Sequence, residues 1–222
     1  MEFSKGHVLY CNVMSQVPGD KDQQLLQEKG GTGFPYLIFM DAEGNILAKH
    51  DGSRDAAGFS ETGKKVSGFM DLRKKAEKGD KATKIDYLIA QLELEHVKPD
   101  EAEKRLKELG KPSKEQQAKL DSALANAAVL EIAKSVKSKE GVIGAGKKYL
   151  EMHKAKKPVP SSERAFQIYW IWMMDAAEGL KDAATYETAL KALKARFGDL
   201  PDAQDFFKGK EETLNKLKAD KK

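Results

Sequence analysis

A proline followed by two short apolar runs with a glycine turn between them is the feature that most limits what this chain can fold into. Residues 36–40 are Tyr-Leu-Ile-Phe-Met, directly after Pro35, and residues 45–50 are Asn-Ile-Leu-Ala-Lys-His. Runs of this length that are rich in β-formers predict strands. The Asp-Ala-Glu-Gly sequence between them ends at Gly44, which can adopt the positive φ that a tight turn needs. The segment therefore predicts a β-hairpin behind Pro35.

The rest of the first 79 residues predicts a small mixed α and β region around this hairpin. The run His-Val-Leu-Tyr-Cys-Asn-Val-Met at residues 7–14 is apolar, rich in β-formers and bounded by glycine and proline, so we expect a buried strand there. In chain order, the predicted elements are the strand at 7–14, a short helix at 22–29, the hairpin, a loop at 51–60 and a helix at 62–78.

The order of these elements resembles the C-terminal part of a thioredoxin-like domain. The resemblance rests on Gly33-Phe34-Pro35 before a strand and on the hairpin at Gly44, and it covers about residues 3–78. It implies a βαββα arrangement in which Pro35 is the family's structural cis-proline. The Cys-x-x-Cys segment of that family is missing, because only about 30 residues precede the hairpin. The resemblance therefore predicts a truncated thioredoxin-like domain over residues 1–79.

The single cysteine limits the redox chemistry of this region. Thiol exchange needs an activated thiolate and a resolving thiol, and Cys11 is the only cysteine in the sequence. Because Cys11 lies within the predicted strand, we expect a buried and inert core cysteine. A mixed or intermolecular disulfide is the alternative. We expect no enzyme activity from the chain as written, although a longer parent could carry the Cys-x-x-Cys pair.

From Asp80 onward the apolar residues follow helical spacing. A first stripe has the spacing i, i+3, i+4 and i+7, and it consists of Ile85, Leu88, Ile89 and Leu92. Residues 182–190 resemble the second helix of a tetratricopeptide-type (TPR) repeat, and residues 99–106 echo it. Further helices are predicted at 99–109, 114–137, 141–154, 161–179 and 182–197, with a last one from Pro201. Residues 80–222 therefore predict an all-helical, TPR-like domain, and the whole chain an α+β fold that is mostly α.

The helix at 161–179 holds the candidate binding residues. Aromatic residues and methionines cover all its sides, and such a helix is normally buried. The alternative is a partner groove, since methionine and aromatic residues are favoured where partners dock. The possible groove residues are Tyr169, Trp170, Trp172, Met173 and Met174.

Composition and motif spacing exclude several classes of site. The chain is 40% hydrophobic and 33% charged with a net charge of +4, and it has no apolar run of about 18 residues, so no membrane span is expected. Its four histidines share no metal-binding spacing, and the glycines at 30–33 lack the lysine of a phosphate loop. The lysines between 147 and 157 predict a solvated surface, because nucleic-acid binding usually adds arginine or aromatic partners. We expect no metal, cofactor, nucleic acid or membrane partner.

These features lead to two hypotheses about function. The first is a non-catalytic protein-binding or scaffold module that binds a protein partner or self-associates as a dimer through an exposed sheet edge. The alternative is the C-terminal fragment of a thiol–disulfide oxidoreductase truncated before its Cys-x-x-Cys pair. The start Met-Glu-Phe-Ser-Lys-Gly lacks the basic and apolar segments of a signal peptide. We therefore expect a cytoplasmic chain, although a longer parent could be exported.

Overall fold

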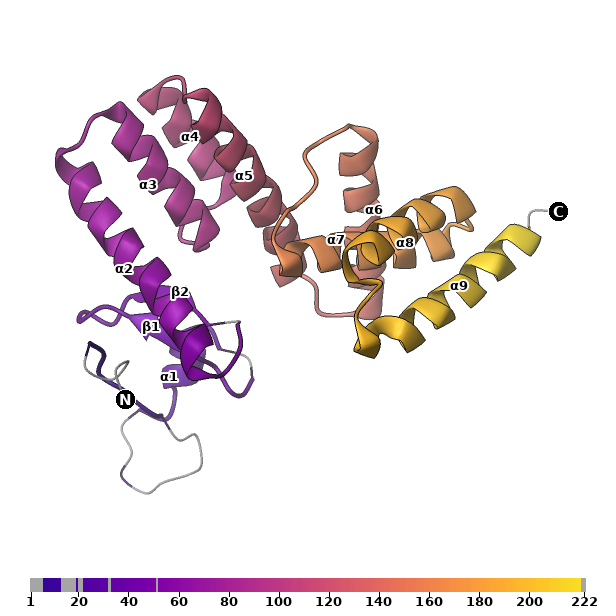
Figure 1. The fold of residues 1–222 in the computed structure, drawn as a ribbon, viewed down its shortest axis with the longest axis horizontal. Coiled ribbons are helices and arrows are strands. Elements are labelled where there is room, and N and C mark those ends of the chain that lie inside the picture. Colours follow the sequence, from indigo (N-terminus) through magenta and orange to yellow (C-terminus); the bar gives the residue numbers. More distant parts are fainter. Residues whose placement is uncertain (1–5, 13–18, 20–21, 32, 51, 221–222) are drawn as a thin grey trace. The chain divides into compact units, whose positions relative to one another are not determined.

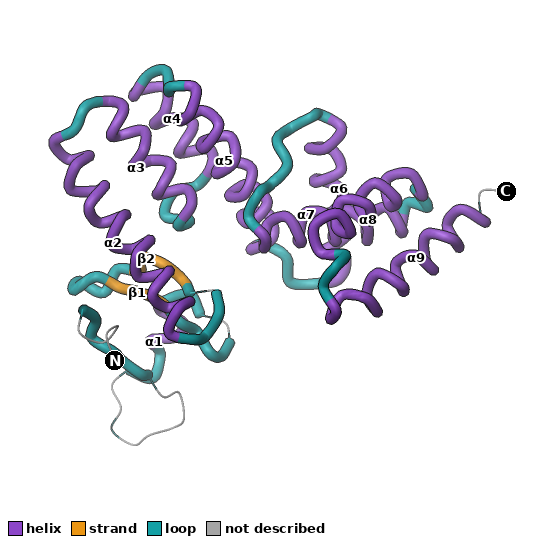
Figure 2. The backbone as a smooth tube through the Cα atoms, in the orientation of Figure 1, coloured by secondary structure: helices purple, strands orange, loops and turns teal. Residues whose placement is uncertain are grey.

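A computed structural model describes residues 6–12, 19, 22–31, 33–50 and 52–220. These residues are mostly helical, with one small antiparallel sheet (Figures 1 and 2). The chain divides into two compact units, Met1–Ala90 and Gln91–Lys222. The division falls within a helix, whereas the sequence pattern places the boundary at residue 79, where helical spacing begins.

The secondary-structure elements follow one another in a simple order. In unit 1 they are α1 (Leu25–Glu28), β1 (Ile38–Met40), β2 (Ile46–Lys49), α2 (Ala56–Lys78) and the start of α3 (Lys81–Glu93). In unit 2 they are the end of α3, then α4 (Pro99–Leu109), α5 (Lys114–Lys134), α6 (Lys139–Lys154), α7 (Glu163–Gly179), α8 (Ala183–Phe197), a 3-10 turn at Pro201–Ala203 and α9 (Gln204–Ala219).

The predicted hairpin is present as strands β1 and β2. The strands pair antiparallel, with Phe39 opposite Ala48. In the turn, Gly44 has a φ of 79° and its amide donates to the carbonyl of Asp41 over 3.1 Å. The Asp41 carboxylate also accepts from the amide of Asn45 over 2.7 Å. The side chain of the aspartate therefore stabilises the turn that its backbone opens.

One face of this hairpin packs against α2, as Figure 1 shows. Leu47 and Ala48 of β2 are buried, and so are Val66 and Phe69 of α2. Helix α2 begins at Ala56, six residues earlier than the predicted start, because the side chain of Asp55 accepts from the amide of Gly58 over 2.8 Å. Residues 56–60, which are half of the loop predicted at 51–60, are therefore helical.

The strand predicted at 7–14 is wrong over its described part. Residues 7–12 form no strand, and residues 13 and 14 lie outside the described residues. The segment is held instead by two side-chain hydrogen bonds. The hydroxyl of Tyr10 donates to the carboxylate of Asp22 over 3.1 Å, and the side-chain amide of Asn12 donates to the backbone carbonyl of Asp22 over 3.2 Å. β-propensity measures the fit to a half-buried pleated surface. Among the described residues the sheet has two strands, β1 and β2, and neither pairs with this segment.

Unit 2 is built from helices that pack against their neighbours in sequence. Helix α6 packs on α7, α7 on α8 and α8 on α9, while α5 covers another side of α7. Helix α5 opens with a capping box, in which the Ser113 side chain and that of Gln116 each accept from the other's backbone amide. Ser162 caps the start of α7, which was predicted to begin at residue 161, and the Asn126 side chain accepts from the backbone amides of Ser161 and Ser162. Helix α7 is therefore fixed at its start and central in the unit.

Candidate binding surface

The structure assigns most of the possible groove residues on α7 to the core of unit 2. Tyr169, Trp170, Met173 and Met174 are all at least 96% buried, and Trp172 is partly buried. The cause is that α5, α6 and α8 all pack on α7. The hypothesis of a partner groove along α7 is corrected accordingly, because these side chains already have intramolecular partners.

Glycine makes the closest of these contacts possible. A Cβ atom added at Gly146 of α6 would lie 1.9 Å from the carbonyl oxygen of Trp172 and 2.8 Å from the Cβ atom of Ala176. The two helices therefore touch backbone to backbone at this point. The aromatic rings of Tyr149 and Trp172 stack beside the contact, with their centroids 6.1 Å apart.

The core tyrosines of unit 2 do not ionise near neutral pH. Burial raises the pKa of Tyr169 and that of Tyr186 to about 12, and it raises the pKa of Tyr149 further. All three hydroxyls are therefore protonated at neutral pH. The hydroxyl of Tyr149 donates to the carbonyl of Val129 over 2.9 Å, which ties α6 to α5.

Pro35 lies at the surface of unit 1, three residues before the start of β1. The bond between Phe34 and Pro35 is cis, and both residues are exposed. The following residue ties the segment down, since the hydroxyl of Tyr36 donates to the carbonyl of Lys29 over 2.7 Å. The ammonium group of Lys29 in turn donates to the carbonyl of Gly44 over 2.7 Å. These two bonds join the end of α1 to both ends of the hairpin.

The chemically reactive side chains of unit 1 do not converge. Cys11 is exposed, which corrects the expectation of a buried cysteine, because the segment around it is not a core strand. His50 is buried, with its Nε2 atom 2.9 Å from the carbonyl of Ser53 and its Nδ1 atom 2.8 Å from the hydroxyl of Thr62. Its ring stacks on Phe59 with centroids 4.2 Å apart. Within the described part of the chain, no three histidine, cysteine or carboxylate side chains are grouped so that they could hold a metal ion.

Exposed apolar side chains are instead concentrated in unit 1. Nine large apolar residues of the described chain are exposed, and five of them lie within residues 8–40. Val8 is 96% exposed, Leu9 68% and Phe34 72%. The five residues, which we name the apolar surface, are Val8, Leu9, Tyr10, Phe34 and Met40.

One described contact links the segment that carries Val8, Leu9 and Tyr10 to strand β1. The ring of His7 lies edge-on to the ring of Phe39 in β1, with centroids 5.7 Å apart. This contact places the start of the exposed segment next to β1. Sequence reasoning missed this surface because an apolar run rich in β-formers predicts burial. The signal that could have found it is the lack of a second apolar strand in residues 1–35 with which the run could pair.

Comparison with known proteins does not indicate a function for this chain. The chain matches no protein-family model, no curated protein and no solved structure. Among the described residues, no helix is long and apolar enough to cross a bilayer. The apolar surface of unit 1 is the candidate functional site, since apolar clusters left in water commonly mark places where proteins bind.

Proposed function

We propose that the chain is a non-catalytic protein-binding module whose apolar surface in unit 1 contacts its partner. The observation that carries the proposal is the concentration of exposed apolar side chains at residues 8–40. Four large apolar residues of unit 2 are also exposed, but they are spread over residues 159–206. Burying Val8 and Leu9 fully would stabilise a complex by about 1.5–3 kcal/mol for each side chain.

The partner that the local geometry favours is a second copy of this chain. Strands β1 and β2 pair with each other, and no third described strand pairs with either. A two-stranded sheet is marginally stable alone and its edges invite pairing. A two-fold dimer would bring the same edge and the same apolar residues of two chains together, since such an interface is formed by one patch used twice.

The proposal also places the two units among known architectures. The order α1, β1, β2, α2 with Pro35 before β1 supports a thioredoxin-like origin of unit 1. The side-by-side packing of α6, α7 and α8 supports a TPR-like arrangement in unit 2. Cys11 takes no catalytic role in this proposal, because the sequence offers no resolving cysteine.

Sedimentation velocity between 1 and 100 µM protein tests the proposal. The double variant Val8→Ser/Leu9→Ser removes two exposed apolar side chains and should cost little folding stability. The matched control is Leu180→Ser/Leu200→Ser in unit 2, where the side chains are 49% and 52% exposed.

We expect the wild type and the control to form dimers over this range and the unit 1 variant to remain monomeric. A wild-type chain that is monomeric at every concentration would overturn self-association. Equal loss of dimer in both variants would show that general surface hydrophobicity, and not the apolar surface of unit 1, holds the copies together.

A further inference from the structure

The positive charge of the chain is concentrated in residues 137–164. This segment carries eight of the 39 basic residues and three of the 35 acidic ones. The remaining residues carry 31 basic and 32 acidic groups, so the net charge of +4 comes entirely from this one segment. A field of one sign on one part of a surface attracts ligands of the opposite sign.

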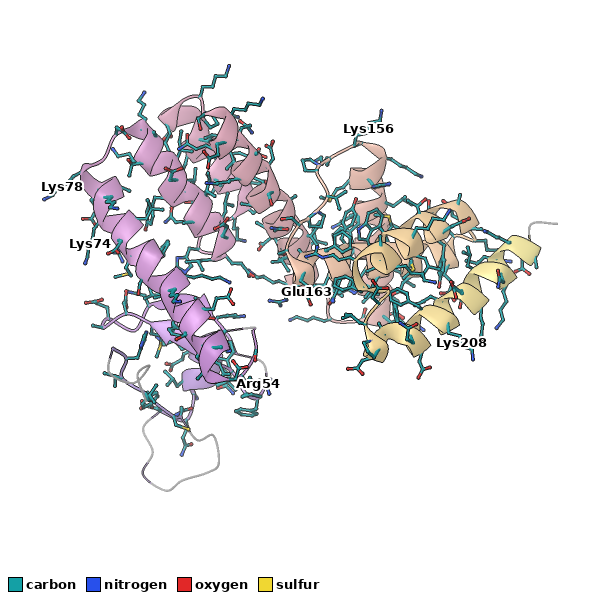
Figure 3. The ribbon with its side chains drawn as sticks, viewed as in Figure 1. Arg54, Lys74, Lys78, Lys156, Glu163 and Lys208 are labelled. Atoms are coloured by element: carbon teal, nitrogen blue, oxygen red, sulfur yellow. The ribbon has the colours of Figure 1, made fainter. Side chains whose placement is uncertain are left out.

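Five exposed lysines of this segment lie along the second half of α6 and the turn after it. We name Lys147, Lys148, Lys154, Lys156 and Lys157 the lysine surface. Lys147 and Lys154 are seven residues apart, so they lie on the same side of the helix about 10 Å from each other. Figure 3 shows Lys156 on the turn, with its side chain directed away from the helices.

The turn after α6 has a fixed backbone. The amide of Lys156 donates to the carbonyl of His153 over 3.0 Å, and the amide of Lys157 donates to the carbonyl of Met152 over 3.1 Å. Lys156 has a φ of 53°, which closes the helix end. The last two lysines are therefore held next to the end of α6, where Lys154 also lies.

The lysine surface lacks the carboxylate partners that several other lysines of unit 2 have. Lys98 pairs with Glu131 and Lys134 with Glu95, each over 2.9 Å. Within the described structure, no ion pair joins any of the five lysines to a carboxylate. Glu151 is the one acidic residue between positions 147 and 157. A carboxylate-bearing ligand therefore meets five cations with little competition from the chain itself.

The chemistry around the lysines distinguishes between polyanions. Sites for single-stranded nucleic acid usually provide aromatic side chains for base stacking and often arginine, whereas Tyr149, the aromatic residue between these lysines, is fully buried. Binding flat on a membrane requires apolar side chains that enter the bilayer. In α6 the buried residues include Ala145, Tyr149 and Leu150, whose side chains belong to the core of unit 2.

We propose that the lysine surface binds an acidic, extended polypeptide segment rich in glutamate or aspartate. Lysine ammonium groups on flexible stems can follow carboxylates whose spacing is not fixed. The pairs would be exposed to solvent, so each contributes little and the binding is sensitive to salt. The lysine surface belongs to unit 2 and the apolar surface to unit 1, so the proposal does not depend on the proposed self-association.

Fluorescence anisotropy with a labelled 20-residue oligoglutamate tests this proposal on the full chain. The variant Lys147→Gln/Lys154→Gln/Lys156→Gln removes three charges from the lysine surface. The control Lys107→Gln/Lys111→Gln/Lys114→Gln removes three exposed charges elsewhere in unit 2 and has the same net charge. Circular dichroism confirms that both variants are folded. A 20-nucleotide oligouridine and vesicles containing phosphatidylserine serve as the competing polyanions.

We expect oligoglutamate to bind the wild type at 20 mM salt and to be released at 300 mM. The lysine-surface variant should bind about tenfold more weakly, since three exposed pairs that each contribute about twofold are lost, and the control should change less than twofold. No binding at 20 mM salt, or equal weakening in both variants, would overturn the proposal. Tighter binding of oligouridine or of the vesicles than of oligoglutamate would also overturn it and assign the surface to that partner.

Discussion

Replacing Gly146 with alanine tests the packing on which the core of unit 2 depends. The new Cβ atom would lie 1.9 Å from the carbonyl oxygen of Trp172 and 2.7 Å from its carbonyl carbon. Both atoms are backbone, so no flexible side chain can move aside. Helix α6 must shift from α7 by about 1.5 Å before the contact reaches an ordinary van der Waals distance.

The expected loss of stability follows from two opposing contributions. Overpacking of a well-packed interface costs about 1–3 kcal/mol, and a contact with backbone belongs at the upper end. Alanine in place of glycine within a helix contributes about 1 kcal/mol in the other direction. We therefore expect Gly146→Ala to lower the free energy of unfolding of unit 2 by about 2 kcal/mol.

Gly144 is the matched control on the same helix. A Cβ atom added there meets nothing within 4 Å, so Gly144→Ala should stabilise α6 by up to about 1 kcal/mol. Urea unfolding followed by tryptophan fluorescence suits the comparison, because both tryptophans of the chain, Trp170 and Trp172, lie in α7. If the two variants change stability equally, the close approach of α6 and α7 at Gly146 is refuted.

Three further predictions concern single side chains. Tyr149→Phe should lower the free energy of unfolding by about 1 kcal/mol, because it removes the hydrogen bond to the carbonyl of Val129. Tyr169→Phe should change the free energy of unfolding by less than about 0.5 kcal/mol, since its buried hydroxyl has no described partner. Equal losses in urea unfolding would contradict this difference. The pKa of Glu187 is lowered to about 2 by hydrogen bonds to Lys218 and Lys191, so its stabilising effect is full above about pH 4.5 and is lost as the pH falls toward 2. Glu187→Gln should therefore lower the urea midpoint at pH 6 and leave it close to the wild-type value at pH 2, and a difference that persists at pH 2 would show that the charge of Glu187 is not the cause. In an insulin-reduction assay with dithiothreitol the chain should not exceed the background rate, and turnover that disappears in Cys11→Ser would overturn the non-catalytic assignment.

Local signals in the sequence were enough to predict most helices and the hairpin. The helix predicted at 99–109 matches α4, because proline is accepted in the first turn of a helix and glycine after its end, as at Pro99 and Gly110. Gly44 marked the hairpin turn because glycine readily adopts the positive φ that the turn needs. These features depend on one or two residues and their immediate neighbours, so a single sequence contains the information.

Features that depend on distant partners could not be predicted in the same way. Residues 7–12 have the composition of a strand, but a strand exists only where another strand accepts its hydrogen bonds. The early start of α2 was missed although its signal is local, since the Asp55 side chain accepts from the amide of Gly58 three residues later. Most of the possible groove residues on α7 are in the core because three helices pack around them, and periodicity along one helix cannot distinguish a core from a groove.

The reactivity of Cys11 measures the central claim most directly. Its thiol is exposed and follows Tyr10, so it lies within the segment that is proposed to pack against a second copy. We expect the rate constant for reaction with a thiol reagent in excess to fall as the protein concentration rises from 1 to 100 µM. In Val8→Ser/Leu9→Ser the rate constant should stay at its low-concentration value throughout. A wild-type rate constant that does not depend on protein concentration would contradict burial of the apolar surface between copies.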